Sequence, residues 1–207
     1  MTITAVHVLA TPDEEREAAV AGGGPVELTV AFTDLEDFTT YTEAEGDDAA
    51  SRLLIGHHRE SGPIVRSRGG RVLKRLGDGL MLTFPEPEAA VLACLELGEV
   101  APLALRAGIH CGHVLVTGDD VIGHAVNLAA RVTGSAEGGE LIVTDHVRTA
   151  VGDLPGVAFD GPHSRRFKGI EKQVPVYFVS RHLRRTPDGP RSLDGGCKSR
   201  PESTTSP

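Results

Sequence analysis

Residues 71–84, RVLKRLGDGLMLTF, restrict the fold of this chain more than any other segment. Two apolar runs flank a Gly-Asp-Gly, and this pattern predicts a β-hairpin over 71–76 and 80–84 with Asp78 at its tip. A simple hairpin turn needs only one glycine, whereas two glycines flank this aspartate. The tip therefore leaves room for a bulky ligand to approach the backbone beside a carboxylate.

The segments around the hairpin predict the fold class. Strand patterns lie at 26–35 and 104–118, and helical patterns lie at 47–70 and 86–100. The order is strand, helix, hairpin, helix, strand, which predicts an α+β domain with a ferredoxin-like βαββαβ core and helices packed on a mostly antiparallel sheet. Many unrelated functions use this arrangement, so the fold alone does not decide what the chain does.

Several local features complete this outline. Pro63 predicts a kink or a break near residue 62 of the first helix, and Gly112 predicts a turn that divides 104–118 into two strands. A further helix is expected over 125–136. Extra C-terminal strands are expected at 140–144, 157–161, 164–169 and 174–179.

The chain divides into three parts by composition. Residues 1–24 form an N-terminal extension, in which Thr11 is placed to cap a short helix before a Gly-rich linker. Residues 25–181 form the predicted domain. Residues 182–207 are rich in Pro, Gly, Ser and charge, which predicts a disordered tail.

Charge and cysteine content exclude some classes of function. The net charge of −8 argues against a generic nucleic-acid or anionic-membrane surface. The three cysteines are odd in number and far apart, which is typical of a reduced protein without a disulfide framework. No apolar run approaches the roughly 18 residues that a membrane span requires. We therefore expect a soluble, cytoplasmic protein with no membrane or nucleic-acid partner.

Two aspartates are candidates for a metal site. Asp34 ends the first strand and Asp78 lies at the hairpin tip, so the two carboxylates come together if their strands are neighbours. Adjacent carboxylates repel one another unless a cation lies between them, and oxygen ligands at an open site favour Mg²⁺ or Mn²⁺. The alternative is that each aspartate only stabilises its own turn.

The helix over 125–136 carries a second pair of candidates. Asn127 and Arg131 are four residues apart and project from one face, while Val126, Ala129 and Ala130 can pack on the other. An arginine can balance the charge of a transferring phosphoryl group, and an asparagine can position a sugar or a nucleophile. The alternative is an ordinary solvated helix face.

Two further clusters have opposite interpretations. Arg165, Arg166 and Lys168 form a local basic patch, which suits phosphate binding in an acidic protein. The segment GIHCGHV contains two histidines and a cysteine, but structural zinc needs about four protein ligands and no second cluster is present. We therefore expect no zinc site.

Five segments taken together resemble the class III nucleotidyl cyclase catalytic domain, of the adenylate cyclase type. They lie in the family's order and at family-like spacing across about 26–180. The segments are VAFTDLEDFTTY, KRLGDGLMLTF, LRAGIHCGHV, DVIGHAVNLAARV and RRFKGIEKQVPVYFV. The resemblance implies conversion of ATP to 3′,5′-cyclic AMP and pyrophosphate by two-metal-ion catalysis.

The resemblance also implies individual roles. Asp34, Asp78 and the carbonyl of Leu35 would bind two Mg²⁺ or Mn²⁺ ions per active site. Lys74 and Asp120 would read the purine, and a Lys/Asp pair is similar to the adenine-selective members, because guanylate cyclases typically carry Glu at the lysine position.

The remaining implied roles concern the ribose and the phosphates. Asn127 would orient the ribose, Arg131 would stabilise charge at the reacting phosphate, and Lys168 would bind the terminal phosphates. His113 stands where some members have a phosphate-binding arginine, so that contact is not carried over.

The resemblance implies a head-to-tail homodimer with two interfacial active sites, because this chain carries both sets of residues. A guanylate cyclase and a catalytically inert nucleotide-binding dimerisation module are the alternatives.

Overall fold

The computed structural model describes residues 25–182, and the expectations for the N-terminal extension and the C-terminal tail lie outside these residues. Eight strands form one mostly antiparallel sheet in the order β2-β3-β1-β4-β6-β8-β7, with β5 paired to β4. Within residues 25–182, only β4 and β6 pair in parallel. The strands are β1 (Val26–Leu35), β2 (Arg71–Leu76), β3 (Gly79–Phe84), β4 (Leu105–Thr117), β5 (Asp120–Ile122), β6 (Leu141–Thr144), β7 (Val157–Arg165) and β8 (Val174–Arg181).

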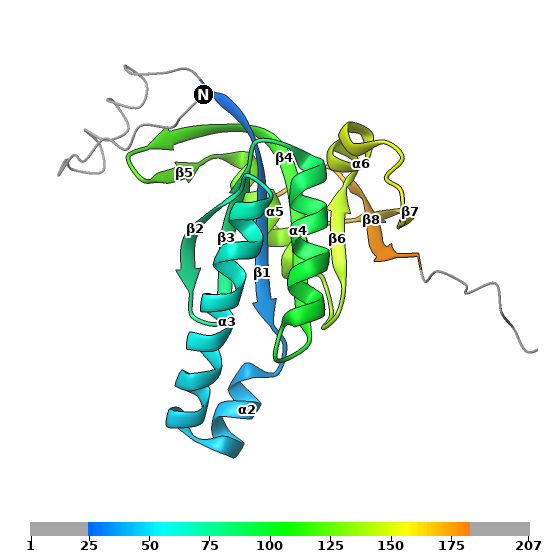
Figure 1. The fold of residues 1–207 in the computed structure, drawn as a ribbon. Coiled ribbons are helices and arrows are strands. Elements are labelled where there is room, and N and C mark those ends of the chain that lie inside the picture. Colours follow the sequence, from blue (N-terminus) through cyan, green and yellow to red (C-terminus); the bar gives the residue numbers. More distant parts are fainter. Residues whose placement is uncertain (1–24, 183–207) are drawn as a thin grey trace, which may run out of the picture.

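Helices cover both faces of this sheet (Figure 1). α3 and α4 pack on one face, and α5 packs on the other, mainly against β4 and β1. The first four strands and the helices between them confirm the predicted ferredoxin-like core with extra C-terminal strands. The helices are α2 (Phe38–Glu45), α3 (Asp47–Ser67), α4 (Pro87–Val100), α5 (His124–Thr133) and α6 (Asp145–Val151). No helix within residues 25–182 is long and apolar enough to cross a bilayer.

The central strand β1 shows why the core has two sides. Successive side chains of a strand point to opposite faces of its sheet. Ala31 and Leu35 belong to the cluster beneath α3 and α4, whereas Leu28 and Val30 belong to the cluster beside α5. β1 is therefore apolar on both faces, and Asp34 follows the same alternation onto the α5 face.

The predicted turn at Gly112 is wrong, because β4 continues unbroken to Thr117 and pairs Gly112 with Leu28 of β1. A Cβ atom at Gly112 would lie 3.4 Å from the Cβ of Ala125 on α5, an ordinary contact that does not require a glycine. The close approach of α5 to β4 occurs at Gly108, where a Cβ atom would lie 2.3 Å from the backbone nitrogen of Thr133. The chain turns instead at Gly118, which has a φ of 58°.

The structure also differs from the sequence-based expectations at Pro63, in the C-terminal strands and in three short elements. α3 runs through Pro63 without a break, because Pro63 is exposed and water can solvate the carbonyl that loses its donor. The strand expected at 157–161 and the first two residues of the one expected at 164–169 form a single strand, β7, with an irregular register around Gly161 and Pro162. Residues 166–169 are not in a strand. Three short elements, α2, β5 and α6, were not expected.

Candidate active site

Asp34 and Asp78 come together at the end of β1. The register of β1 with β3 pairs Thr33 with Leu80, which places the hairpin tip beside the last residues of β1. Burial raises the pKa of Asp78, and the nearby charge of Asp34 raises it further. The expected pairing of the two carboxylates is therefore present in the fold.

Gly79 makes this approach possible. A Cβ atom at Gly79 would lie 2.5 Å from the carbonyl oxygen of Thr33 and 3.3 Å from Oδ1 of Asp34. Any side chain here would push the hairpin tip away from β1. Gly77 has a φ of 68°, which a residue with a side chain rarely adopts. Gly77 therefore allows the turn, whereas Gly79 allows the hairpin tip to approach β1.

Arg106 of β4 is part of this site, and the sequence interpretation gave it no role. It is the direct register partner of Asp34. Its Nε donates to Oδ2 of Asp34 at 2.8 Å, and its Nη2 donates to the same oxygen. Oδ2 is therefore held by the guanidinium, while Oδ1 is the oxygen nearest the hairpin tip. The signal in the sequence was the one arginine of this strand, placed between two apolar residues.

The donor atoms at this end fit a hard divalent ion. Two negatively charged carboxylates face each other at a partly open tip, and a cation between them would offset their repulsion. Within residues 25–182 no group of three or more His, Cys, Asp or Glu side chains could hold a metal. Ions bound by this chain alone would consequently need further oxygen ligands from the backbone, water or a ligand.

A β-bulge determines where Lys74 points. Val72 pairs with Leu82, and Lys74 pairs with Met81, so Leu73 is an extra residue in β2. Leu82 belongs to the core cluster beneath α3, whereas Met81 belongs to the cluster on the α5 face. In a regular strand Lys74 would share the face of Val72, and the bulge turns it to the other.

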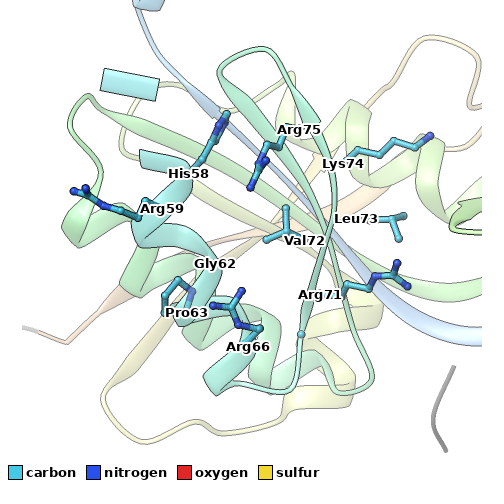
Figure 2. A pocket seen from close by; sticks show the side chains of 11 residues that line it. His58, Arg59, Gly62, Pro63, Arg66, Arg71, Val72, Leu73, Lys74 and Arg75 are labelled. Carbon is cyan, nitrogen blue, oxygen red and sulfur yellow. The ribbon is translucent and has the colours of Figure 1, made fainter. Parts of the chain in front are cut away.

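The lysine meets Asp120 on that face. Lys74 and Asp120 form an ion pair, although they are 46 residues apart in the chain. Asp120 comes from β5, which folds back on β4 after the turn at Gly118. Figure 2 shows Lys74 and Leu73 on one side of β2 and Val72 and Arg75 on the side of α3. The bulge and the short β5 together build this pair.

Asn127 and Arg131 are both exposed on α5, as the helix periodicity predicted. The packing face differs from the expectation in one position, because Ala130 is exposed while Ala125, Leu128 and Ala129 are buried. A 3.6-residue period places Ala130 beside Asn127 and Arg131 rather than opposite them. The small side chain of Ala130 keeps the surface between these two residues open.

Phe167 explains the position of Lys168. Its side chain is buried in the cluster that contains Leu128 and Val132 of α5. This anchor fixes the segment after β7 against the helix, and the exposed Lys168 follows it directly. Arg165 donates to the carbonyl of Ser135, so it has a structural role. Of the predicted basic patch, Lys168 and Arg166 remain exposed.

The whole described region matches the family model for the adenylate and guanylate cyclase catalytic domain, over residues 25–181. The chain belongs to the class III nucleotidyl cyclases. A pH-sensitive adenylate cyclase of Mycobacterium tuberculosis is 35% identical over an alignment of 194 residues, which covers 87% of this chain and 47% of that protein. An adenylate cyclase of Streptomyces coelicolor is 34% identical over an alignment of 116 residues, which covers 53% of this chain and 30% of that protein. The chain therefore spans half or less of the length of these two cyclases.

Solved cyclase structures share the fold. The adenylyl cyclase CyaB of P. aeruginosa has a TM-score of 0.68 at 24% identity, covering 78% of this chain and 97% of that structure. A guanylyl cyclase structure has a TM-score of 0.67 at 21% identity, covering 80% of this chain and 98% of that structure. Adenylyl and guanylyl cyclases both occur among these structures, so the similarity establishes the fold only. The preference for ATP or GTP has to be argued from individual residues.

Within residues 25–182, the histidines of β4 do not belong to a group of side chains that could hold a metal ion. His110 is buried, and its Nδ1 lies 2.8 Å from Oγ1 of Thr144. Burial lowers the pKa of His110 to about 4, with further lowering by His146 and His124. His110 is thus a neutral core residue, and His113 is exposed near the start of β1, opposite Glu27.

Proposed function

We propose that this chain is an adenylate cyclase that converts ATP to 3′,5′-cyclic AMP and pyrophosphate. The observation that carries the proposal is the Lys74–Asp120 pair, which a bulge and a separate short strand bring together on the α5 face. A pair built by two independent local features is more than a chance surface contact. Its chemistry matches the adenine edge of ATP.

The pair can read adenine through hydrogen bonds. The Asp120 carboxylate accepts from the exocyclic amino group, and Lys74 Nζ donates to a ring nitrogen. Guanine presents a carbonyl oxygen where adenine has this amino group, so Asp120 would face an acceptor. The side chains of Lys74 and Asp120 are 43% and 34% exposed, and exposed ion pairs contribute only about 0–1 kcal/mol. Adenine can therefore replace part of their mutual contact at small cost.

Asp34, Asp78 and the carbonyl of Leu35 are the groups that would hold two Mg²⁺ or Mn²⁺ ions. Such ions supply the positive charge that acidifies the ribose 3′-hydroxyl and neutralises the leaving pyrophosphate. Arg106 keeps Oδ2 of Asp34 in a fixed position, so Oδ1 is directed to the hairpin tip. This geometry lets Asp34 and Asp78 present oxygens to the same region.

The other residues act on the nucleotide itself. Asn127 orients the ribose so that its 3′-hydroxyl can attack the α-phosphate in line, and Arg131 stabilises the charge that develops there. Lys168 binds the terminal phosphates, supported by the anchor of Phe167 against α5. No protein nucleophile takes part, because the ribose hydroxyl is the nucleophile.

The active form is a head-to-tail homodimer with two interfacial sites. Asp34, Lys74 and α5 lie on the same face of the sheet, and no hydrogen bond or ion pair within residues 25–182 links the Asp34–Asp78 pair to the Lys74–Asp120 pair. A second protomer facing this surface would bring its own Lys74 and Arg131 to the first protomer's aspartates. A monomer would hold only half of each site.

Product identification tests this function. Purified protein is incubated with Mn²⁺ and either ATP or GTP, and the products are separated by chromatography. We expect cyclic AMP and pyrophosphate in equal amounts, with a clear preference for ATP. Cyclic GMP as the main product would identify a guanylate cyclase. Binding of ATP without pyrophosphate release would identify an inert nucleotide-binding module.

A further inference from the structure

A basic groove lies between α3 and β2, on the face opposite the Lys74–Asp120 contact (Figure 2). Its volume is about 870 Å³, which is within the range of small-molecule sites. His58, Arg59 and Arg66 of α3 and Arg75 of β2 are among the residues that line it, and Figure 2 shows Arg59 directed away from β2. None of the residues that line it is Asp or Glu, in a chain whose net charge is −8. Positive charge is thus concentrated in this groove, although the chain as a whole is negatively charged.

Two of the arginines that line this groove lack acidic partners among the described residues. Arg66 and Arg75 form no ion pair there, and the contact of Arg59 with Glu60 is a long 3.8 Å between two exposed side chains. Arginines at the margins differ: Arg68 pairs with Glu96 at 3.0 Å, and Arg71 pairs with Asp119 at 3.3 Å. The guanidinium groups that remain available are therefore those that face the groove.

His58 provides an independent indication of a missing partner. Its Nε2 is shielded from solvent and has no hydrogen-bond partner among the described residues. A buried polar atom without a partner is costly, which makes a ligand contact at this position favourable. Burial lowers the pKa of His58, and the charge of Arg75 lowers it further, so these two side chains lie close together.

We propose that this groove is a binding site for polyphosphate anions. Guanidinium groups match phosphate oxygens in geometry as well as charge, because their N–H groups form a planar fork. The lining has no Phe, Tyr or Trp on which a nucleobase could stack. The recognised group is therefore the phosphate chain itself, with at least two linked phosphates to span Arg66 and Arg75.

The groove borders the proposed nucleotide site, because Leu73 and Lys74 are among the residues that line it. Arg75 lies on the α3 side of β2, whereas the bulge at Leu73 turns the side chain of Lys74 to the α5 side. The guanidinium groups of the groove and the ion pair of Lys74 with Asp120 are therefore on opposite sides of β2. The inference does not depend on the proposed cyclase activity, and binding can be measured without turnover.

Calorimetric titration of the full chain with pyrophosphate and tripolyphosphate in EDTA tests the proposal. We expect binding that Arg66→Gln/Arg75→Gln weakens by tenfold or more and that higher salt weakens as well. Arg52→Gln is the matched control, because Arg52 lies on α3 outside the groove and should leave the affinity unchanged. Circular dichroism verifies that each variant is folded.

Two comparisons identify the site and the ligand. The imidazole resonances of His58 should shift on addition of tripolyphosphate, and orthophosphate should bind more weakly than either linked anion. If the anion binds the nucleotide site instead, Lys168→Ala removes binding and Arg66→Gln/Arg75→Gln does not. That result, equal affinity in the double variant and the wild type, or no binding by the wild type would each overturn the proposal.

Discussion

The proposed metal end and the proposed base-reading end of this cyclase domain are built in different ways. Asp34 lies on the central strand β1, and its partner Arg106 is the directly opposite residue of β4. Lys74 lies on the edge strand β2 behind a bulge, and Asp120 lies on a strand of three residues. The charge-stabilising end is thus fixed by regular pairing, whereas the recognition end depends on two irregular features. We infer that substrate choice can change in this fold without disturbing the metal end.

Replacing Asp34 should have the largest effect. Asp34→Ala removes a carboxylate from the metal end, and we expect turnover to fall by about 10³-fold or more, because charge stabilisation at the reacting phosphate is the main catalytic term. Cyclic nucleotide assays measure the loss, and sedimentation verifies that the dimer remains. Glu96→Ala is a matched control, because Glu96 is a similarly exposed carboxylate in an arginine pair. Near-normal turnover in Asp34→Ala would refute the metal assignment.

Lys74→Ala tests the base-reading end. We expect kcat/KM for ATP to fall by about 10²-fold, because buried or oriented hydrogen bonds to a substrate edge discriminate strongly. Mn²⁺ binding, followed by electron paramagnetic resonance, should be unchanged because the metal end is built separately. Retention of ATP preference in Lys74→Ala would break the comparison between the ends.

The pH dependence of stability tests whether His110 is neutral in the folded protein. Its pKa in the folded protein is lowered from 6.5 to about 4 by burial, so its neutral form is favoured on folding. The stabilisation is complete above pH 6.5 and is lost as pH falls from 6.5 towards 4. One pKa unit corresponds to about 1.4 kcal/mol, so about 2 kcal/mol should be lost between pH 7 and 5.

Urea unfolding at a series of pH values measures this loss. His110→Gln should have a flatter profile over this range, while His113→Gln, at an exposed position of the same strand, should retain the wild-type slope. Identical slopes in the wild type and His110→Gln would show that another group controls the acid sensitivity.

Arg106→Gln should have a smaller effect on stability. Without the guanidinium, Asp34 and Asp78 face each other with no counter-charge, and we expect a loss of about 1–2 kcal/mol in metal-free protein. Arg68→Gln breaks an ion pair of similar exposure whose carboxylate has no such neighbour, so it should cost less. Mn²⁺ should reduce the difference in melting temperature between Arg106→Gln and the wild type. Equal losses in the two variants would show that Arg106 does not offset the paired carboxylates.

The sequence predicted the fold because its elements depend on local patterns, and it predicted the paired aspartates on the condition that their strands are neighbours, which the pairing of β1 with β3 meets. The hairpin at 71–84 and the flanking helices follow from periodicity, and the glycines around Asp78 indicate its unusual tip. The predicted turn at Gly112 is wrong because a glycine inside an extended strand looks the same in the sequence as one needed for a turn. The role of Arg106 depends on the register of β1 with β4, which periodicity does not give.

The bulge in β2 illustrates the same limit. Hydrophobic alternation over six residues does not reveal one extra residue, yet that residue decides which face Lys74 occupies. The lysine's role came from a resemblance between motifs, whereas its orientation required the strand pairing. The short strand β5 was similarly hidden, because three residues carry no periodic signal.

Complementation between two inactive variants tests the central claim, that each active site takes one end from each protomer. Asp34→Ala and Lys74→Ala proteins are assayed alone and after mixing under conditions that exchange protomers. In a head-to-tail dimer, half of the mixed dimers are heterodimers in which one of two sites is intact, so activity should recover to about a quarter of the wild-type level. No recovery, with exchange verified by mass spectrometry, would contradict the account.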